Sequence, residues 1–398
     1  MIPFERDVTV SDALARAHQT LQRRGLRATS TRFGGALCTV EVALRDVNGT
    51  VLATGHGKGD ATSARVGGLF EAIEHYMSLH APEAFQCISS PVEAVRKALG
   101  SPVDALLAAQ PGRSLGCRPY CDMHDGTTQL LPTGLVQPRY ITRPLPDDTF
   151  DYNALERYAS NSGTAIGSTP TEAMLHGLNE SIERDDVSRW LFAHFHAQTS
   201  ESLQLIDRAT CDTPLALAWR AAETALGDEV VLVDASTRDG TSTRMAFAMH
   251  WPHAVHLYGA GCSRCPAHAG ERALAELVQQ AVRSKGTELM DAFATQTLNR
   301  LAAWPALARA CRANLPGLMG CKPLAWVRAG TRASWSTPKD MLRSTVNELV
   351  GDGYRPLVYW LTAQEDVSLC SIVVPGFSRY FLVGNGIPVA PLWSRSNE

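Results

Sequence analysis

The chain has 398 residues, of which 45% are hydrophobic and 19% are charged, and its formal net charge is −3. This composition is typical of a globular protein, and the absence of Lys/Arg clusters with interleaved aromatic residues excludes nucleic acid as an expected substrate. The N-terminal residues MIPFERDVTV do not form a secretion signal, and no stretch reaches the roughly 18 apolar residues of a membrane span. We therefore expect a cytoplasmic protein without a membrane segment.

The first elements predict a mixed α+β protein. Residues 36–55 alternate in polarity around the turn sequence Asn48-Gly49 and predict a β-hairpin. The sequence GHGKGD at residues 55–60 predicts a glycine-rich loop, and an acidic helix is expected at residues 62–79.

The same order of strand, glycine-rich segment and acidic helix recurs twice. A second loop, SNSGTAIGST at residues 160–169, precedes a helix at 170–190, and a strand at 254–261 precedes a helix through 271–286. Further strands at residues 322–336 and 354–374 flank a last helix. We expect an α+β fold of mixed sheets packed with helices, divided approximately into residues 1–150, with the first acidic helix, and 151–398, with the other two.

The acidic helices carry carboxylates in a pattern that favours metal binding. Glu180 and Glu183 lie about 80° and 20° around the helix from Glu172, so all three share one face. Closely spaced acids also occur in the other two helices, at Glu71 and Glu74 and at Glu276, where Gln280 follows four residues later.

These acids have two interpretations. They could face solvent, but apolar residues surround them and Lys partners four residues further on are missing. Same-sign carboxylates on one face repel unless a cation joins them, and hard oxygen ligands suit Mg²⁺ bridging phosphates. Arg184 is placed to hold a phosphate or carboxylate. The pattern therefore favours a nucleotide held through Mg²⁺.

The motifs of two common binding sites, the P-loop and the zinc site, do not match this sequence. GHGKGD lacks P-loop spacing and has Asp60 where Ser or Thr should follow Gly-Lys. Cys262 and Cys265 form a lone C-x-x-C, whereas a zinc site would require a second pair. We interpret these two residues as structural thiols, with shared zinc as the alternative.

Three segments together resemble the YcaO family. They are GKGDATSARVGGLFEAIEHY, SNSGTAIGSTPTEAMLHGLNESIERDDVSRW and ERALAELVQQ, and with the closing VVPGF the resemblance covers about residues 50 to 380. The resemblance implies a YcaO-type fold with ATP and Mg²⁺ between three acidic helices. Glu71, Glu74, Glu172, Glu180, Glu183 and Glu276 match acids that contact Mg²⁺ or ATP, and the nucleotide or its phosphates would be contacted by Lys58, Ser162, Arg184 and Gln280. Three positions depart from the family pattern, namely Gly67, His75 and Gly177.

The resemblance also implies the chemistry. A nucleophile adds to a backbone amide of a precursor peptide, the amide oxygen is phosphorylated by ATP, and phosphate leaves. Cyclodehydration of Cys, Ser or Thr to an azoline is the first expectation, although the Pro388 and Pro391 spacing departs from the P-x-P-x-P ending of azoline-forming relatives. Thioamide formation with a TfuA-type partner is the second, and an amidine product or a non-catalytic YcaO scaffold remain alternatives. The resemblance further implies a separate leader-peptide-binding, ubiquitin-activating-like or TfuA-type partner protein and allows a homodimer.

Overall fold

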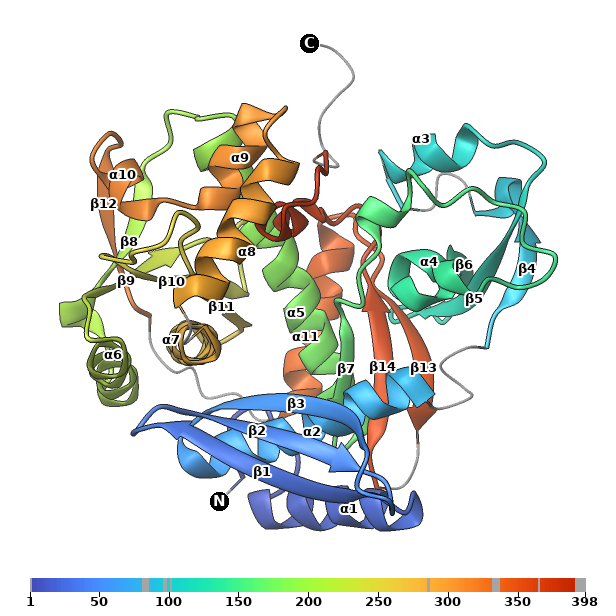
Figure 1. The fold of residues 1–398 in the computed structure, drawn as a ribbon, viewed down its shortest axis with the longest axis horizontal. Helices are drawn as coiled ribbons and strands as arrows, with labels where there is room; N and C mark the ends of the chain where they lie inside the picture. The colour runs from blue at the N-terminus through green and yellow to red at the C-terminus, as the bar shows by residue number, and fades with distance from the viewer. Residues whose placement is uncertain are drawn as a thin grey trace.

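The structure is a computed structural model that describes residues 2–80, 86–95, 99–100, 102–284, 287–330, 337–363 and 366–390. Within these ranges the chain forms three β-sheets that surround a central helix, α5 (Pro170–Leu191). Figure 1 shows α5 in the middle of the molecule, with one sheet below it and the other two on either side. The expected α+β architecture is confirmed. Among the described helices, none combines the length and the apolarity needed to cross a bilayer.

The N-terminal sheet is an antiparallel meander, β1 (Arg27–Gly34), β2 (Cys38–Arg45) and β3 (Val51–Gly59). The predicted hairpin is present, and Asp46 stabilises its turn by accepting hydrogen bonds from the backbone N–H groups of Asn48 and Thr50. Helices α1 (Val10–Arg23) and α2 (Ala61–His80) pack with this sheet. The prediction of a glycine-rich loop at residues 55–60 is wrong, because β3 continues to Gly59.

The second sheet joins distant parts of the chain. Its strand order is β4 (Ile88–Pro91), β5 (Ser114–Asp122), β13 (Leu357–Ala363), β14 (Ser368–Val373) and β7 (Thr164–Gly167), and β6 (Thr128–Pro132) pairs with β5. Short helices α3 (Val103–Ala108) and α4 (Thr133–Val136) lie beside it. Since the sheet contains strands from both sides of residue 150, the approximate division at that residue does not separate the sheets.

The third sheet has the order β11 (Tyr258–Ser263), β10 (Ser242–Ala248), β9 (Val230–Asp234), β8 (Leu203–Asp207) and β12 (Leu324–Arg328). Helices α6 (Thr213–Leu226) and α7 (Pro266–Arg283) contact each other, and α7 packs on β10 and β11. The remaining helices are α8 (Thr287–Arg300), α9 (Pro305–Arg312), α10 (Leu315–Met319) and α11 (Pro338–Gly351).

Each acidic helix follows a strand whose glycines allow the helix backbone to come unusually close. A Cβ at Gly57 of β3 would lie 1.7 Å from the Ala64 carbonyl oxygen of α2. A Cβ at Gly259 of β11 would similarly lie 2.1 Å from the Ala273 carbonyl oxygen of α7, and Gly167 meets α5 in the same way. No side chain fits these positions. The glycines therefore bring α2, α5 and α7 close to their own strands.

The three strand–helix units also contact one another. Helix α7 touches β2 and β3, α2 touches β7, and α5 touches β11. As a result, residues that lie more than two hundred positions apart in the sequence meet at the centre of the molecule.

Candidate active site

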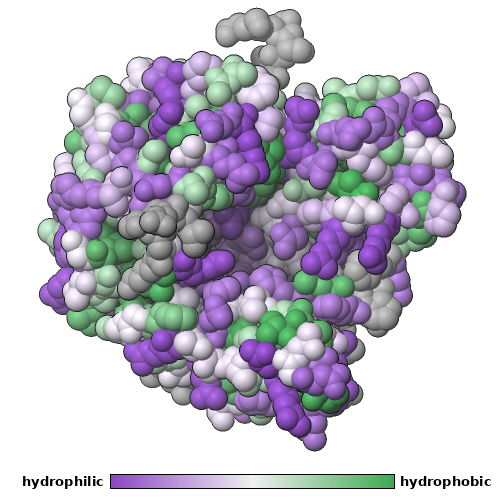
Figure 2. Space-filling view, viewed as in Figure 1, coloured by the Kyte–Doolittle hydropathy of each residue, from purple (hydrophilic) through white to green (hydrophobic). Residues whose placement is uncertain are grey.

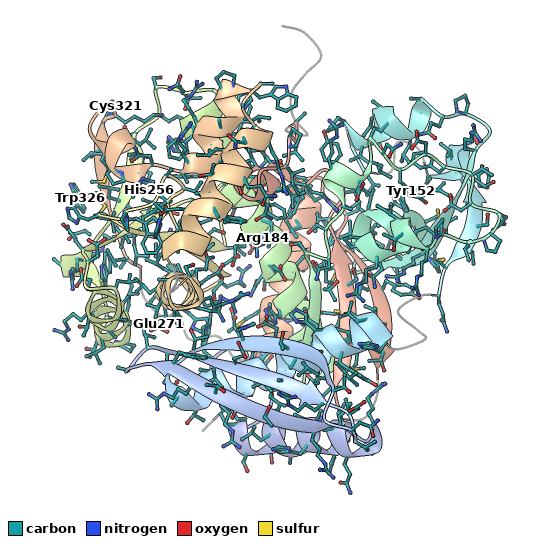
Figure 3. All side chains as sticks on the ribbon, viewed as in Figure 1. Tyr152, Arg184, His256, Glu271, Cys321 and Trp326 are labelled. Atoms are coloured by element: carbon teal, nitrogen blue, oxygen red, sulfur yellow. The ribbon has the colours of Figure 1, made fainter. Side chains whose placement is uncertain are left out.

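A hydrophilic hollow opens at the centre of the molecule, between the three lobes that contain the sheets (Figure 2). In the same view, Arg184 on α5 lies at this place (Figure 3). Most of the residues selected from the sequence come from the three elements that meet here: β3 with α2, α5, and α7.

Lys58, at the end of β3, joins the first unit to the third. Its Nζ lies 2.5 Å from Oε2 of Glu276 on α7, and Nε2 of Gln280 donates to the other Glu276 oxygen at 3.2 Å. Burial alone would raise the pKa of Glu276, but the nearby Lys58 and Arg184 outweigh burial and lower it. The structure therefore brings Lys58, Glu276 and Gln280 into direct contact.

Ser162, Glu180 and Arg184 form the second group. The Ser162 hydroxyl donates to Oε1 of Glu180 at 3.2 Å, and the same oxygen lies 3.7 Å from Nε of Arg184, one turn later. The Arg184 guanidinium stacks 5.2 Å above the ring of Phe381, while its buried Nε has no hydrogen-bond partner among the described residues. Burial opposes the charge of Arg184, but Glu183, Glu180 and Glu276 raise its pKa. Arg184 thus stays charged and keeps an unused donor.

Glu183 is only 3% exposed and receives no hydrogen bond from the described part of the chain. Burial, and then the neighbouring Glu276 carboxylate, raise its pKa, although Arg184, Arg272 and Lys58 act in the opposite direction. The Glu276 carboxylate of α7 therefore acts as a like charge on Glu183 of α5, and a bound cation would relieve their repulsion.

A second pair of like charges, Glu74 on α2 and Glu180 on α5, lies between these two helices. Glu74 accepts a hydrogen bond from the Ile166 backbone N–H at 3.1 Å, and its pKa is raised well above normal by burial, then by Glu180 and Glu71. Glu71 is more open, with 38% of its side chain exposed, and its Oε1 lies 3.9 Å from Nε2 of His75. Glu71 is therefore the more accessible of the two acids on α2.

Glu172 is placed differently from the other selected acids. It is 2% exposed at the start of α5, and its two oxygens accept backbone N–H bonds from Asp7 at 2.7 Å and Ser168 at 3.0 Å. The N-cap Thr169 in turn accepts from the Glu172 N–H, an arrangement similar to a capping box. Glu172 also lies about 12 Å along the helix from Glu180, at 1.5 Å per residue. We therefore leave Glu172 out of the metal site proposed below and assign it a structural role.

The sequence motifs did not point to three titratable residues near the site, Arg272, His176 and Glu5. Arg272 on α7 has its pKa raised by Glu5, Glu183 and Glu276 against the effect of burial, and the pKa of His176 on α5 is lowered well below normal by burial, then by Arg272 and Arg6. His176 was detectable, since it precedes Glu180 by one helical turn. The contribution of Glu5 had no local signal, because it depends on the path of the N-terminus.

The donor set fits Mg²⁺ together with phosphate. Among the described residues, no three His, Cys, Asp or Glu side chains converge on one point. Mg²⁺ is commonly held by one or two carboxylates, several waters and the substrate phosphates, so paired carboxylates are sufficient. The Arg184 guanidinium is a suitable phosphate donor, since its Nε makes no hydrogen bond to the described residues. Cys262 and Cys265 are both fully buried, and they lie in different core clusters.

Residues 55–378 match the family model described as YcaO cyclodehydratase, which binds ATP and Mg²⁺. Because this match covers most of the sequence, the chain belongs to the YcaO family, whose cofactors are ATP and Mg²⁺. The family predicted from the three acidic motifs is confirmed.

Known structures support the same fold. YcaO from Methanopyrus kandleri, bound with AMPPCP and Mg²⁺, superposes with a TM-score of 0.67 at 19% identity, covering 97% of this chain and 96% of that one. A heterocyclase in complex with substrate and cofactor gives 0.66 at 18% identity, covering 94% of this chain but 53% of the other. These similarities establish the fold.

A curated relative is similar in sequence. It is an uncharacterized protein in the tfuA 3′ region of Rhizobium leguminosarum bv. trifolii, 26% identical over 293 residues. The match spans 69% of this chain and 66% of the relative, which is slightly less than two thirds of the relative's length.

Proposed function

We propose that the chain activates backbone amides of a precursor peptide at the expense of ATP, with Mg²⁺ held between α2, α5 and α7. The observation that carries this proposal is the pairing of like charges across the helices: Glu74 with Glu180, and Glu183 with Glu276. Buried carboxylates arranged in this way are unfavourable without a cation. Their retention at one place, beside an arginine whose Nε makes no hydrogen bond in the described part of the chain, is explained by a metal–phosphate ligand.

We assign the metal contacts to the acids of α2, α5 and α7 whose like charges act on one another. Glu74, Glu180, Glu183 and Glu276 form this set, with Glu71 at its open end. Lys58 and Gln280 hold the Glu276 carboxylate in a fixed orientation, and Ser162 does the same for Glu180. Arg184 binds phosphate oxygens through its guanidinium, and Lys58 is close enough to the same acids to share this role.

When bound, ATP supplies the phosphoryl group that turns the amide oxygen into a leaving group, and Mg²⁺ offsets the charge on the phosphates. The chain's own residues position the peptide and exclude water. A pocket beside Arg184 and Ser162 suits the peptide, because its other walls are mostly apolar: Leu99, Val103, Leu135, Ile372, Val374, Phe377 and Phe381. Arg184 therefore lies between the phosphate side and the peptide side of the site.

Cyclodehydration of Cys, Ser or Thr to an azoline is the first candidate reaction. The family model is described as a cyclodehydratase, and the fold is similar to that of heterocyclases. A structural match to the Escherichia coli microcin synthetase McbBCD complex, with a TM-score of 0.56, motivates a separate partner protein that delivers the peptide.

Thioamide formation is the second candidate. It is favoured by the curated relative, whose gene lies in a tfuA 3′ region. In that reaction a sulfur donor replaces the side-chain nucleophile, and the amide oxygen again leaves as phosphate. A TfuA-type protein would then be the partner.

The two candidates predict opposite mass changes. The full chain is incubated with ATP, Mg²⁺, candidate precursor peptide and partner protein, with and without a sulfide source, and the peptide mass and ADP are measured. Loss of one water per site identifies azoline formation, whereas exchange of one oxygen for one sulfur identifies thioamidation. The Glu183→Gln chain is the matched control and should leave the peptide unchanged. A wild-type chain that releases no ADP with any peptide would favour the non-catalytic scaffold.

A further inference from the structure

A short N-terminal segment, Phe4 to Asp7, lies before the family-matched residues 55–378 yet contacts two of the three acidic helices. At α5, the Asp7 N–H donates to Glu172, and the Thr169 hydroxyl donates to the Asp7 carboxylate at 2.6 Å. At α7, the Phe4 ring meets His268 edge-on at 5.0 Å. Phe4 also packs against two hydrophobic clusters, one that contains residues of α5 and one that contains residues of α7. The segment therefore ties α5 to α7.

Glu5 is the central residue of this segment. It is 5% exposed and has a φ of 60°, a conformation that non-glycine residues adopt rarely and only where surrounding contacts hold them. Its Oε1 accepts from Ser263 of β11 at 2.6 Å and from Asn179 of α5 at 3.3 Å. Its Oε2 lies 3.8 Å from Nε2 of His268 on α7. Contacts from three elements thus position this buried carboxylate.

Arg272 connects Glu5 to the site. Its Cβ lies against Gly261 of β11, and its buried Nε has no hydrogen-bond partner among the described residues. Arg272 lies one helical turn after His268, which Glu5 contacts, and one turn before Glu276, so it stands between the two acids along α7. Burial lowers the pKa of Arg272, but Glu5 and then Glu183 raise it. One cation is therefore shared between an acid behind the site and the two acids that we assign to Mg²⁺.

We infer that Glu5 is a positioning residue for the Mg²⁺–nucleotide site and that it acts through Arg272, an inference that rests on the site proposed above. Glu5 draws part of the Arg272 charge away from Glu183 and Glu276, which leaves both carboxylates available to Mg²⁺. Without the Glu5 charge, Arg272 competes with the metal for the same two acids. The inference assigns a function to a residue outside the family-matched region.

The test measures nucleotide binding without turnover. Isothermal titration calorimetry of the full chain with AMPPCP is carried out at several Mg²⁺ concentrations. For Glu5→Gln, which keeps an acceptor for Ser263 but removes the charge, the dissociation constant should rise about tenfold, in the range found for residues that support metal ligands. The loss should shrink as the Mg²⁺ concentration is raised, because Mg²⁺ and Arg272 compete. Exposed Glu201 provides the control variant, Glu201→Gln, which should bind like the wild type.

A double-mutant cycle separates positioning from a general structural role. In an Arg272→Met background, adding Glu5→Gln should change the affinity by less than about twofold, since the competing cation is gone. Arg272→Gln serves if the Met variant does not fold. Equal losses in both backgrounds, or wild-type affinity in Glu5→Gln, would overturn the inference. If the wild-type chain itself does not bind Mg²⁺–AMPPCP, the proposed nucleotide site fails, and the inference fails with it.

Discussion

Two neighbouring stretches of α5 carry buried acids in opposite surroundings. In the first, Glu180 accepts one hydrogen bond from Ser162, and Glu183 accepts none from the described residues. In the second, Asp185 accepts from the Ser378 N–H at 2.7 Å and from Arg189 at 2.8 Å. The following Asp186 accepts from Thr237, from Thr243 at 2.6 Å and from Arg238 at 2.8 Å.

The difference shows how a structural acid can be distinguished from one available for a ligand. Arg238 pairs with both Asp185 and Asp186 and stacks 4.5 Å from the Phe377 ring, so its charge is balanced by the protein itself. Glu183 instead faces another carboxylate, Glu276. Since Glu183 is buried beside a like charge, a bound cation would stabilise the first stretch, whereas hydrogen bonds and Arg238 already satisfy the second.

The largest effect is expected from disrupting the second stretch of α5, in which Arg238 balances the charges of Asp185 and Asp186. Arg238→Met removes the cation from two buried carboxylates and should lower the free energy of unfolding by about 3–5 kcal/mol. Arg208→Met is the matched control, because Arg208 pairs with Glu223 at the surface and should contribute about 1 kcal/mol or less. Urea denaturation measures both changes. Equal losses in the two variants would contradict the distinction.

Substitutions in the first stretch of α5, at Glu180 and Glu183, should lower ATP turnover and leave the stability of the fold intact. Glu180→Gln and Glu183→Gln each remove a proposed metal ligand, and ATP turnover should fall at least about a hundredfold. The thermal midpoint of the ligand-free Glu183→Gln chain should stay the same or rise, because burial and Glu276 already disfavour this charge. ADP release and calorimetry give the two readouts. Normal turnover in Glu183→Gln would refute the metal assignment.

Asp186 in the second stretch also predicts that the free energy of unfolding depends on pH. Burial outweighs Arg238 and the two threonines and raises the pKa of Asp186 from 3.8 to about 6. Between these values the folded chain binds a proton that the unfolded chain does not, so this residue stabilises the fold as the pH is lowered through 6. Relative to Asp186→Asn, the wild type should gain about 1 kcal/mol of unfolding free energy between pH 7 and pH 5. Parallel stability profiles would show that Asp186 does not titrate in this range.

The smallest effect is expected at Cys262, whose thiol lies close to both stretches. Burial, then Asp186, raise its pKa well above normal, so the thiol stays neutral and is a poor metal ligand. Cys262→Ala should change the unfolding free energy by about 1 kcal/mol and leave turnover unaltered. Metal analysis checks the interpretation of this pair, because loss of one bound zinc per chain would show that Cys262 and Cys265 form a site.

The sequence by itself determined the local elements and the types of residue at the site. Asn48-Gly49 specified the hairpin, and the helical spacing of Glu71, Glu74, Glu180, Glu183 and Glu276 predicts metal-bound phosphate, because helical periodicity and turn chemistry are local properties. The order of three acidic helices was specific enough to predict the family correctly.

Only the tertiary structure decided which acids face one another. Glu172 and Glu183 share one face of α5, but Glu172 is satisfied by backbone N–H groups of Asp7 and Ser168, whereas Glu183 is exposed to the like charge of Glu276 from α7. Likewise, the glycines expected in a loop before α2 lie in β3, because close packing of strand and helix requires them there. The contact of Glu5 with β11 and α5 joins residues separated by up to 258 positions. Such contacts depend on how the chain folds back on itself, which local propensity does not encode.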